Sequence, residues 1–134
     1  MEISDQQIAR ELLLLLSRIK HNAHLLAEEK GITRIQLYAL YLIYERDELA
    51  MHELASFMQC DASNVTGVVD RLVSQGIVKR KENPKDRRFK LLELTDKGRG
   101  VMAAIEAELP DRIGSNLLSR DERHTLHTVI QKMI

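Results

Sequence analysis

The sequence predicts a mainly α-helical protein of the α+β class, in which one β-hairpin lies between helices. Ser4, Thr33 and Ser119 are each followed three positions later by glutamine or glutamate, the capping-box pattern that begins helices. Apolar residues recur at helical spacing after these positions. Two strand-like segments, 77–82 and 89–94, flank a proline-containing turn and predict the hairpin.

The first predicted helix covers about residues 5–30, and Gly31 ends it. Its apolar stripe is formed by Ile8, Leu12, Leu15, Leu16, Ile19, Ala23 and Leu26. Leu13, Leu14 and Leu25 lie off that stripe. Because a helix that is apolar on more than one side needs more than one partner surface, we expect a second subunit to cover it.

The middle of the chain predicts two short helices joined by a tight turn. In order, the expected elements are helix 33–46, a minimal strand at 49–51, helix 52–58 and helix 62–75. Asp61 is the expected N-cap of the last helix, and Gly76 is the expected left-handed residue that ends it. This arrangement is a helix-turn-helix.

The C-terminal part predicts two further helices. Thr95 is expected to cap a helix over 96–109, which Pro110 ends or kinks. The last helix begins after Ser119 and carries one apolar face. That face is made of Leu126, Val129, Ile130 and Met133.

Composition limits the classes of protein that fit. The 134 residues are one domain's worth, 44% of them hydrophobic and 30% charged, which supports a core and a soluble surface. The single cysteine excludes an internal disulfide and fits a reducing compartment. The N-terminus lacks the basic region of a signal peptide, and the apolar run 12–16 is too short to span a bilayer. We therefore expect a cytoplasmic protein without membrane contact.

The net charge of zero hides an uneven distribution. Residues 62–100 hold ten Lys/Arg against five Asp/Glu, whereas the segments before and after hold more acids than bases. Seven of the ten bases lie within 79–90. Local charge sets the field that a phosphate backbone experiences, so this segment is a candidate nucleic-acid contact.

Helix 62–75 separates its apolar and polar side chains. Val65, Val68, Val69 and Leu72 share the face that is expected to pack on the core. The opposite face carries Ser63, Asn64, Thr66, Gly67, Asp70, Arg71 and Ser74. Short polar side chains with one cation suit hydrogen bonds to bases and phosphates in a DNA major groove, although a polar helix face is also what solvent favours.

The hairpin turn strengthens the DNA interpretation. Arg87 and Arg88 lie at its tip, with Lys85 and Lys90 on either side. The narrow minor groove of A·T-rich DNA attracts arginine. Asp86 can hold an arginine in place within the turn. A helix-turn-helix followed directly by a basic tip predicts binding to double-stranded DNA.

These motifs resemble a known family of regulators. The runs Glu53-Leu54-Ala55, Ser63-Asn64-Val65-Thr66, Val69-Asp70-Arg71-Leu72 and Gly76-Ile77-Val78 are similar to winged helix-turn-helix proteins. Asp86-Arg87-Arg88 followed by Leu94-Thr95-Asp96-Lys97-Gly98 resembles the MarR (multiple antibiotic resistance regulator) family in particular.

The resemblance implies a homodimeric transcriptional regulator, usually a repressor, that binds a pseudo-palindromic operator. Residues 1–32 and 110–134 would form the dimerisation helices, and residues 33–109 the winged DNA-binding domain. Helix 62–75 would enter the major groove while Arg88 reaches the minor groove. Asp70 and Asp86 would pair with wing arginines and fix the angle of the wing.

The resemblance also implies a small, often aromatic or anionic ligand between the dimer helices and the winged domain. His24, Tyr38 and Tyr41 are the residues we expect near that cavity. Ordinary packing in the core or at an interface is the alternative for each of them.

Thiol or metal sensing are further alternatives. Oxidation of Cys60, in the turn between the two DNA-binding helices, can displace the second helix, although a small buried cysteine is the simpler interpretation. The pairs His21/His24 and His124/His127 lie on helices that pack together in the family, but exposed histidines explain them as well. We expect no metal and no cofactor.

Enzyme motifs are absent from the sequence. His52-Glu53 begins like a zinc-protease helix but lacks the second histidine, and no nucleophile elbow or phosphate-binding glycine loop occurs. We therefore expect no enzymatic activity. A winged domain used only for protein–protein assembly is the alternative from another class, and it does not need arginines at the wing tip.

Overall fold

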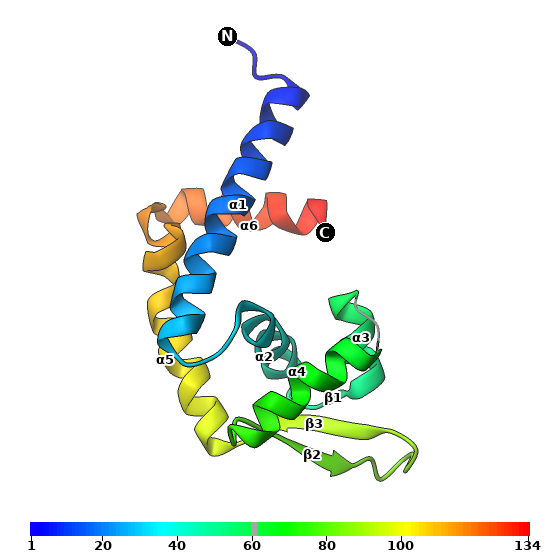
Figure 1. Ribbon diagram of the computed structural model, residues 1–134. Coiled ribbons are helices and arrows are strands. Elements are labelled where there is room, and N and C mark those ends of the chain that lie inside the picture. Colours follow the sequence, from blue (N-terminus) through cyan, green and yellow to red (C-terminus); the bar gives the residue numbers. More distant parts are fainter. Residues whose placement is uncertain (60–61) are drawn as a thin grey trace.

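The computed structural model describes residues 1–59 and 62–134, without the side chains of residues 62 and 63. It has the predicted architecture, a mainly helical chain with one small antiparallel sheet (Figure 1). The elements in order are α1 (Asp5–Glu29), α2 (Arg34–Arg46), β1 (Leu49–Ala50), α3 (Met51–Met58), α4 (Ala62–Ser74), β2 (Val78–Glu82), β3 (Lys90–Leu94), α5 (Asp96–Ile113), the 3-10 turn η1 (Ser115–Leu117) and α6 (Arg120–Met133).

Side-chain caps begin the helices where the sequence predicts them. The Ser4 hydroxyl accepts the backbone N–H of Gln7 at the start of α1. Complete capping boxes begin α2 at Thr33 and α6 at Ser119, in which a side chain three residues later bonds back to the cap. Gly76 ends the α4 region with φ of +74°, a left-handed conformation that glycine adopts without steric cost.

The predicted end of α5 at Leu109 is wrong. The helix passes through Pro110 to Ile113 and ends at Gly114, whose N–H bonds to the Pro110 carbonyl at 3.0 Å. Proline removes one helix hydrogen bond, but its φ suits a helix, and packing on α1 holds the last turn. The Asn22 amide donates to the Arg112 carbonyl at 2.8 Å, so the turn after the proline is anchored from outside.

The sheet is three-stranded and antiparallel, in the order β1-β3-β2. Arg80 pairs with Leu92 and Val78 with Leu94, while the minimal strand β1 pairs Leu49 with Leu92. Leu92, Leu94 and Val78 are buried, and their neighbours along β2 and β3 are exposed or partly exposed. One face of the sheet therefore closes the core, and the hairpin beyond it extends into solvent as a wing.

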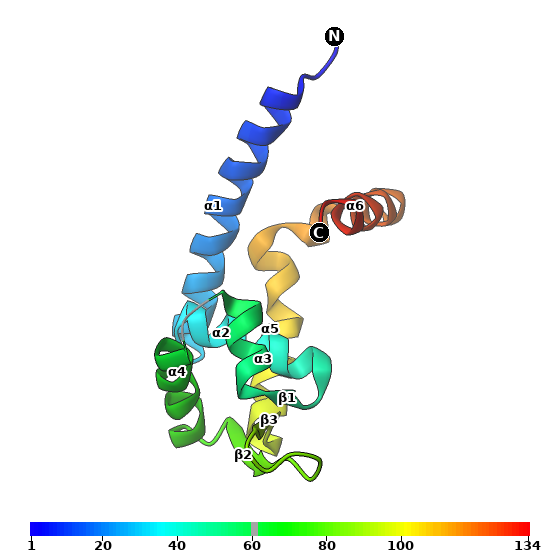
Figure 2. The same cartoon turned by 90° about the vertical axis from the view of Figure 1, so that its right-hand side faces the viewer.

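The core lies among α2, α3, α4, the sheet and the adjoining ends of α1 and α5 (Figure 2). Its largest fully buried side chains are Leu26, Leu40, Ile43, Leu49, Leu54, Leu72, Leu92, Met102, Ile105, Val65, Val69 and Val78. Aliphatic residues build this core, as expected for a chain with 4% aromatic residues.

The start of α5 is fastened to the segment between α4 and β2. The Thr95 hydroxyl caps α5 and also donates toward the carbonyls of Gly76 and Ile77. A side chain at Gly98 would place its first carbon 2.1 Å from the Ile77 carbonyl oxygen, so this close approach requires glycine. The wing and the end of α4 are thus held against α5.

Two helical segments are exposed along their whole length within the described part of the chain. The N-terminal half of α1 extends away from the domain, and every residue from 1 to 18 is exposed (Figure 1). All of α6 is exposed too; it crosses behind α1 in Figure 1 but stands apart from it in the turned view of Figure 2. Within the described residues, no helix is long and apolar enough to cross a membrane.

Candidate nucleic-acid interface

Helix α4 and the wing lie at the same end of the molecule, opposite the free half of α1, in both views (Figures 1 and 2). Val65, Val69 and Leu72 attach α4 to the core and are almost completely buried. The opposite face is exposed. On it lie Asn64, Thr66, Gly67, Asp70, Arg71 and Ser74. The predicted separation of the two faces is therefore present.

Part of the predicted site cannot be placed. Cys60 and Asp61 lie outside the described residues, and so does the side chain of Ser63. The proposed redox role of Cys60, the N-cap at Asp61 and the base contact from Ser63 stay predictions.

Gly67 has no structural requirement for being glycine. It sits in the middle of α4, it is exposed, and a Cβ built on it meets nothing within 4 Å. Glycine in a helix interior costs about 1 kcal/mol relative to alanine. The fold thus bears a cost at this position that neither packing nor backbone conformation explains.

The turn of the wing is ordered by its own side chains. The Asn83 carboxamide oxygen accepts the N–H of Lys85 at 3.0 Å, and the N–H of Asp86 donates to the Asn83 carbonyl at 3.2 Å. A further bond runs from the N–H of Phe89 to the Asp86 carbonyl. Asparagine initiates such turns because its side chain mimics a backbone carbonyl. The backbone of the tip therefore has a defined conformation at the positions that carry the arginines.

Arg88 is clamped by Asp86. One Asp86 oxygen accepts both the backbone N–H and the Nε–H of Arg88, at 3.1 and 3.0 Å, and the other accepts Nη2 at 2.8 Å. These bonds from Arg88, the side-chain ones first, lower the pKa of Asp86, and Asp86 in turn raises the pKa of Arg88. The Arg88 side chain remains 82% exposed, so it is oriented by the acid and still open to a partner.

Arg87 is less restrained. Its Nε lies 3.6 Å from a Glu82 oxygen, beyond ordinary hydrogen-bond distance, and its side chain is 86% exposed. Of the two arginines at the tip, Arg88 is the pre-oriented one.

Asp70 connects α4 to the wing. Its carboxylate accepts a hydrogen bond from the guanidinium of Arg80 in β2. The sequence suggested that Asp70 pairs with a wing arginine, and the structure brings it to Arg80 at the base of the wing, not to the tip. Arg80 was missed as a candidate site residue, although its place on the solvent face of a strand beside α4 was a usable signal.

Acidic side chains neutralise two lysines on the sheet. Lys79 and Lys81 lie 3.1 and 3.2 Å from the two oxygens of Glu93, and Lys81 also bonds to Glu48. The pKa of Glu93 is lowered, chiefly by the hydrogen bond that Lys79 donates to it. By contrast, Arg71, Lys85 and Lys90 form no ion pair with the described part of the chain. On α4 and the wing, these three cations and the exposed side chains of Arg87 and Arg88 are therefore available to a partner.

A cavity of about 560 Å³ lies between α1, α2 and the end of α5. Tyr38 and Tyr41 line it, but His24 does not; His24 Nε2 lies 3.1 Å from Glu28 Oε1. Burial and, to a lesser extent, the negative charge of Glu106 raise the pKa of Tyr41 to about 12. Lys20 and Arg34 are the cationic residues of an otherwise largely apolar lining. No cluster of three or more metal-binding side chains occurs among the described residues.

Comparison with known proteins gives one consistent result. The family model described as MarR family matches residues 32–90. The uncharacterised HTH-type transcriptional regulator YkoM of Bacillus subtilis is 31% identical over 108 residues, which cover 79% of this chain and 70% of YkoM. The regulator YdgJ of the same organism is 33% identical over 106 residues, covering 77% of this chain, and the match spans only 64% of YdgJ's length.

Solved structures agree over nearly the whole chain. A mutant of Escherichia coli MarR complexed with operator DNA superposes with a TM-score of 0.73 at 26% identity, covering 95% of this chain and 93% of that one. Wild-type apo MarR from the same organism gives a TM-score of 0.76 at 25% identity, covering 100% and 99%.

Proposed function

The chain belongs to the MarR family, and from this membership we propose that it is a transcriptional regulator that binds double-stranded DNA as a homodimer. The observation that carries the proposal is the exposed polar face of α4 beside a wing whose Arg88 is pre-oriented by Asp86. The MarR mutant of the same fold was solved on operator DNA. The curated relatives are named as transcriptional regulators, in line with the expectation that the chain is not an enzyme.

In the proposed complex α4 occupies the major groove and the wing reaches the adjacent minor groove. Asn64, Thr66 and Arg71 then face base edges or phosphates, with Ser63 added from the sequence. Arg87, Arg88, Lys85 and Lys90 approach the backbone and the minor groove. Two such units recognise half-sites about one helical turn apart, roughly 10 base pairs between centres.

The dimer is proposed from the unpacked apolar surface of α1 and α6. Leu12 to Leu16 are 39 to 70% exposed, and Leu126, Val129 and Ile130 are 43 to 44% exposed. Neighbouring exposed apolar side chains on a soluble protein mark an interaction surface. A second copy is the proposed occupant, because both helices lie outside the winged domain and the MarR relatives share them over nearly their full length.

A ligand is proposed for the cavity that Tyr38 and Tyr41 line. Its apolar wall suits an aromatic ring, and Lys20 and Arg34 suit a carboxylate, so we propose a small aromatic acid. The cavity lies where α1 and α2 meet the end of α5. A ligand bound in this cavity can shift the winged domain relative to the dimerisation helices, and this shift can cause the protein to release DNA.

The DNA proposal is tested by selecting bound fragments from a randomised duplex library and measuring their affinity at several salt concentrations. We expect an enriched palindrome and a steep loss of affinity with salt. Arg88→Ala should reduce the slope of log affinity against log salt by about one, because one phosphate-region contact is lost. Arg10→Ala, which removes the same charge from the far end of α1, should leave the slope unchanged. Equal slopes for both variants would remove Arg88 from the interface.

Gly67→Ala separates stability from recognition. The substitution should stabilise the fold by up to about 1 kcal/mol, since it adds no clash and favours the helix. If α4 approaches DNA closely at this point, the added methyl should weaken binding by about tenfold or more, equivalent to ~1.4 kcal/mol. Gly100→Ala is the matched control, because Gly100 also lies within a helix with nothing within 4 Å of its Cβ position. Thermal unfolding and binding are measured for both; a Gly67→Ala protein that binds as tightly as Gly100→Ala would contradict the close approach.

Sedimentation tests the dimer. The wild-type protein should sediment at about twice the chain mass of 15.4 kDa. The double variant Leu126→Glu/Ile130→Glu should dissociate, because unpaired carboxylates would be buried in the interface at a cost of several kcal/mol. Gln131→Glu, which adds charge to the opposite face of α6, should remain dimeric. A wild-type protein that sediments at the monomer mass would end the dimer proposal.

Benzoate serves as the probe for the ligand proposal. It should lower the DNA affinity of the wild-type protein, and Lys20→Met/Arg34→Met should reduce this effect about tenfold by removing the two charges that hold the carboxylate while keeping long apolar side chains. Cyclohexylmethanol, which lacks the charge, is the control compound. If the double variant responds to benzoate as the wild-type protein does, benzoate binds at another site.

A further inference from the structure

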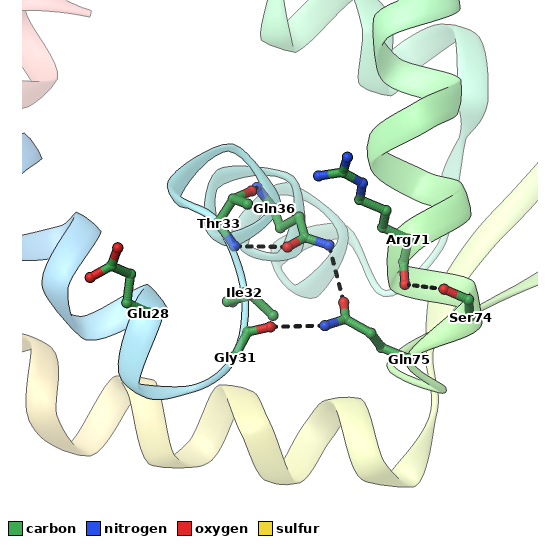
Figure 3. Close-up of a pocket in the computed structure, with 8 residues that line it drawn as sticks. All are labelled: Glu28, Gly31, Ile32, Thr33, Gln36, Arg71, Ser74 and Gln75. Carbon is green, nitrogen blue, oxygen red and sulfur yellow. Dashed lines mark hydrogen bonds between the residues drawn. The ribbon is translucent and has the colours of Figure 1, made fainter.

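The junction of α1, α2 and α4 contains a polar bridge that the DNA contacts do not account for. Gln36 is 3% exposed and is the one buried polar side chain among the residues whose burial is described. It faces Gln75, which follows the last residue of α4 (Figure 3). Buried amides are retained where their hydrogen bonds fix a geometry, since an unpaired one is costly.

The two glutamines are linked head to tail. The Thr33 N–H donates to Gln36 Oε1 at 2.7 Å, and Gln36 Nε2 donates to Gln75 Oε1 at 3.1 Å. Gln75 Nε2 then donates to the Gly31 carbonyl at 2.8 Å. We call this chain, from Thr33 through Gln36 and Gln75 to Gly31, the glutamine relay. Figure 3 shows it crossing the opening between the α1–α2 turn and the end of α4.

Helix capping explains only half of the relay. Gln36 closes the capping box of α2 through its Oε1 atom, and a helix start needs nothing more from it. The bond from Nε2 goes to Gln75, 39 positions away and directly after the last residue of α4. This second bond ties α4 to the α1–α2 turn and has no role in beginning α2.

The same end of α4 is held from its other side by α5. Lys97 Nζ donates to the Gln75 carbonyl at 2.8 Å, and the Thr95 hydroxyl bonds to the carbonyl of Gly76. Helices α1 and α5 are in turn joined, because Lys30 pairs with Glu108 at 3.1 Å. The end of α4 is therefore clamped between the two helices that lead to the proposed dimer surface.

We infer that the glutamine relay is a positioning device that sets the direction of α4 relative to α1 and α5. Gln75 is its central residue. The inference rests on the proposed function, since in a dimer this direction determines which separation of half-sites both copies of α4 can reach. Directional amide bonds resist rotation of α4 in a way that apolar contacts of the same size do not.

The test uses the double variant Gln36→Leu/Gln75→Leu. Replacing both partners of a hydrogen bond by apolar groups of similar size is close to neutral for stability. The groups that they release, on Gly31 and Thr33, belong to exposed residues. Gln131→Leu is the matched control, because it makes the same substitution on the exposed outer face of α6, outside the relay and away from α4. Thermal unfolding verifies that all three proteins are folded.

DNA binding is measured on the selected operator and on versions with one base pair added or removed between half-sites. One base pair displaces a half-site by about 3.4 Å and rotates it by about 34°. The wild-type protein and Gln131→Leu should lose about 100-fold in affinity, because one half-site can no longer be engaged. In the double variant the loss should shrink to about tenfold, as a less fixed α4 reaches the displaced site. If the folded double variant loses as much affinity as the wild-type protein when the half-site spacing is changed, the inference about the relay is wrong.

Hydrogen exchange keeps the inference separate from the proposed function. Amides of the last turn of α4 and of residues 75–77 should exchange about tenfold faster in the double variant, whereas those of α3 should not change. If the wild-type protein binds no DNA but this acceleration is found, the DNA proposal fails and the relay stands. Unchanged exchange at the end of α4 in a folded double variant overturns the relay whatever the DNA result.

Discussion

The attachment of Ile77 to the start of α5 is the constraint on which the rest of the arrangement depends. The Ile77 carbonyl receives the Thr95 N–H at 3.0 Å and lies where any side chain on Gly98 would be. Ile77 joins the end of α4 to the first strand of the wing. A single close contact of backbone with backbone therefore fixes both elements of the candidate interface to the long helix α5. The bonds from the Thr95 hydroxyl to Gly76 and from Lys97 to Gln75 reinforce this attachment.

Charge pairing explains how a chain of zero net charge presents a basic surface. Glu93 and Glu48 neutralise Lys79 and Lys81 on the sheet. On α4 and the wing, Arg71, Lys85 and Lys90 form no ion pair within the described chain, and the paired arginines of the tip, Arg87 and Arg88, remain 86% and 82% exposed. The distribution thus matters more than the total, since screening in physiological salt limits each charge to a range of about 8 Å.

Local patterns predicted most of the fold, and long-range contacts account for what they missed. The caps at Thr33 and Ser119, the left-handed Gly76 and both wing strands follow from neighbouring residues, and they are found as predicted. Pro110 was misjudged because α5 is anchored beyond it by Asn22, which is 90 positions from Arg112, the residue that it contacts.

The candidate site divides in the same way. The polar face of α4 and the exposed tip arginines could be read from helical spacing and turn chemistry. The position of His24 outside the cavity depends on how α1 is rotated against α2, which the sequence does not specify. The contact of Gln36 with Gln75 could not be predicted either, because single glutamines carry no periodic signal.

Asp70 shows how the interface can include an acid. A carboxylate on the outer face of α4 would repel a polyanion, and its pairing with Arg80 cancels that charge where it stands. The pair is partly exposed, so it contributes little to stability. Its main effect is to fix the position of α4 relative to β2. It joins α4 to the base of the wing while Asp86 orients Arg88 at the tip. Each acid thus offsets the charge of one arginine in the candidate interface, and its hydrogen bonds fix the direction of that arginine.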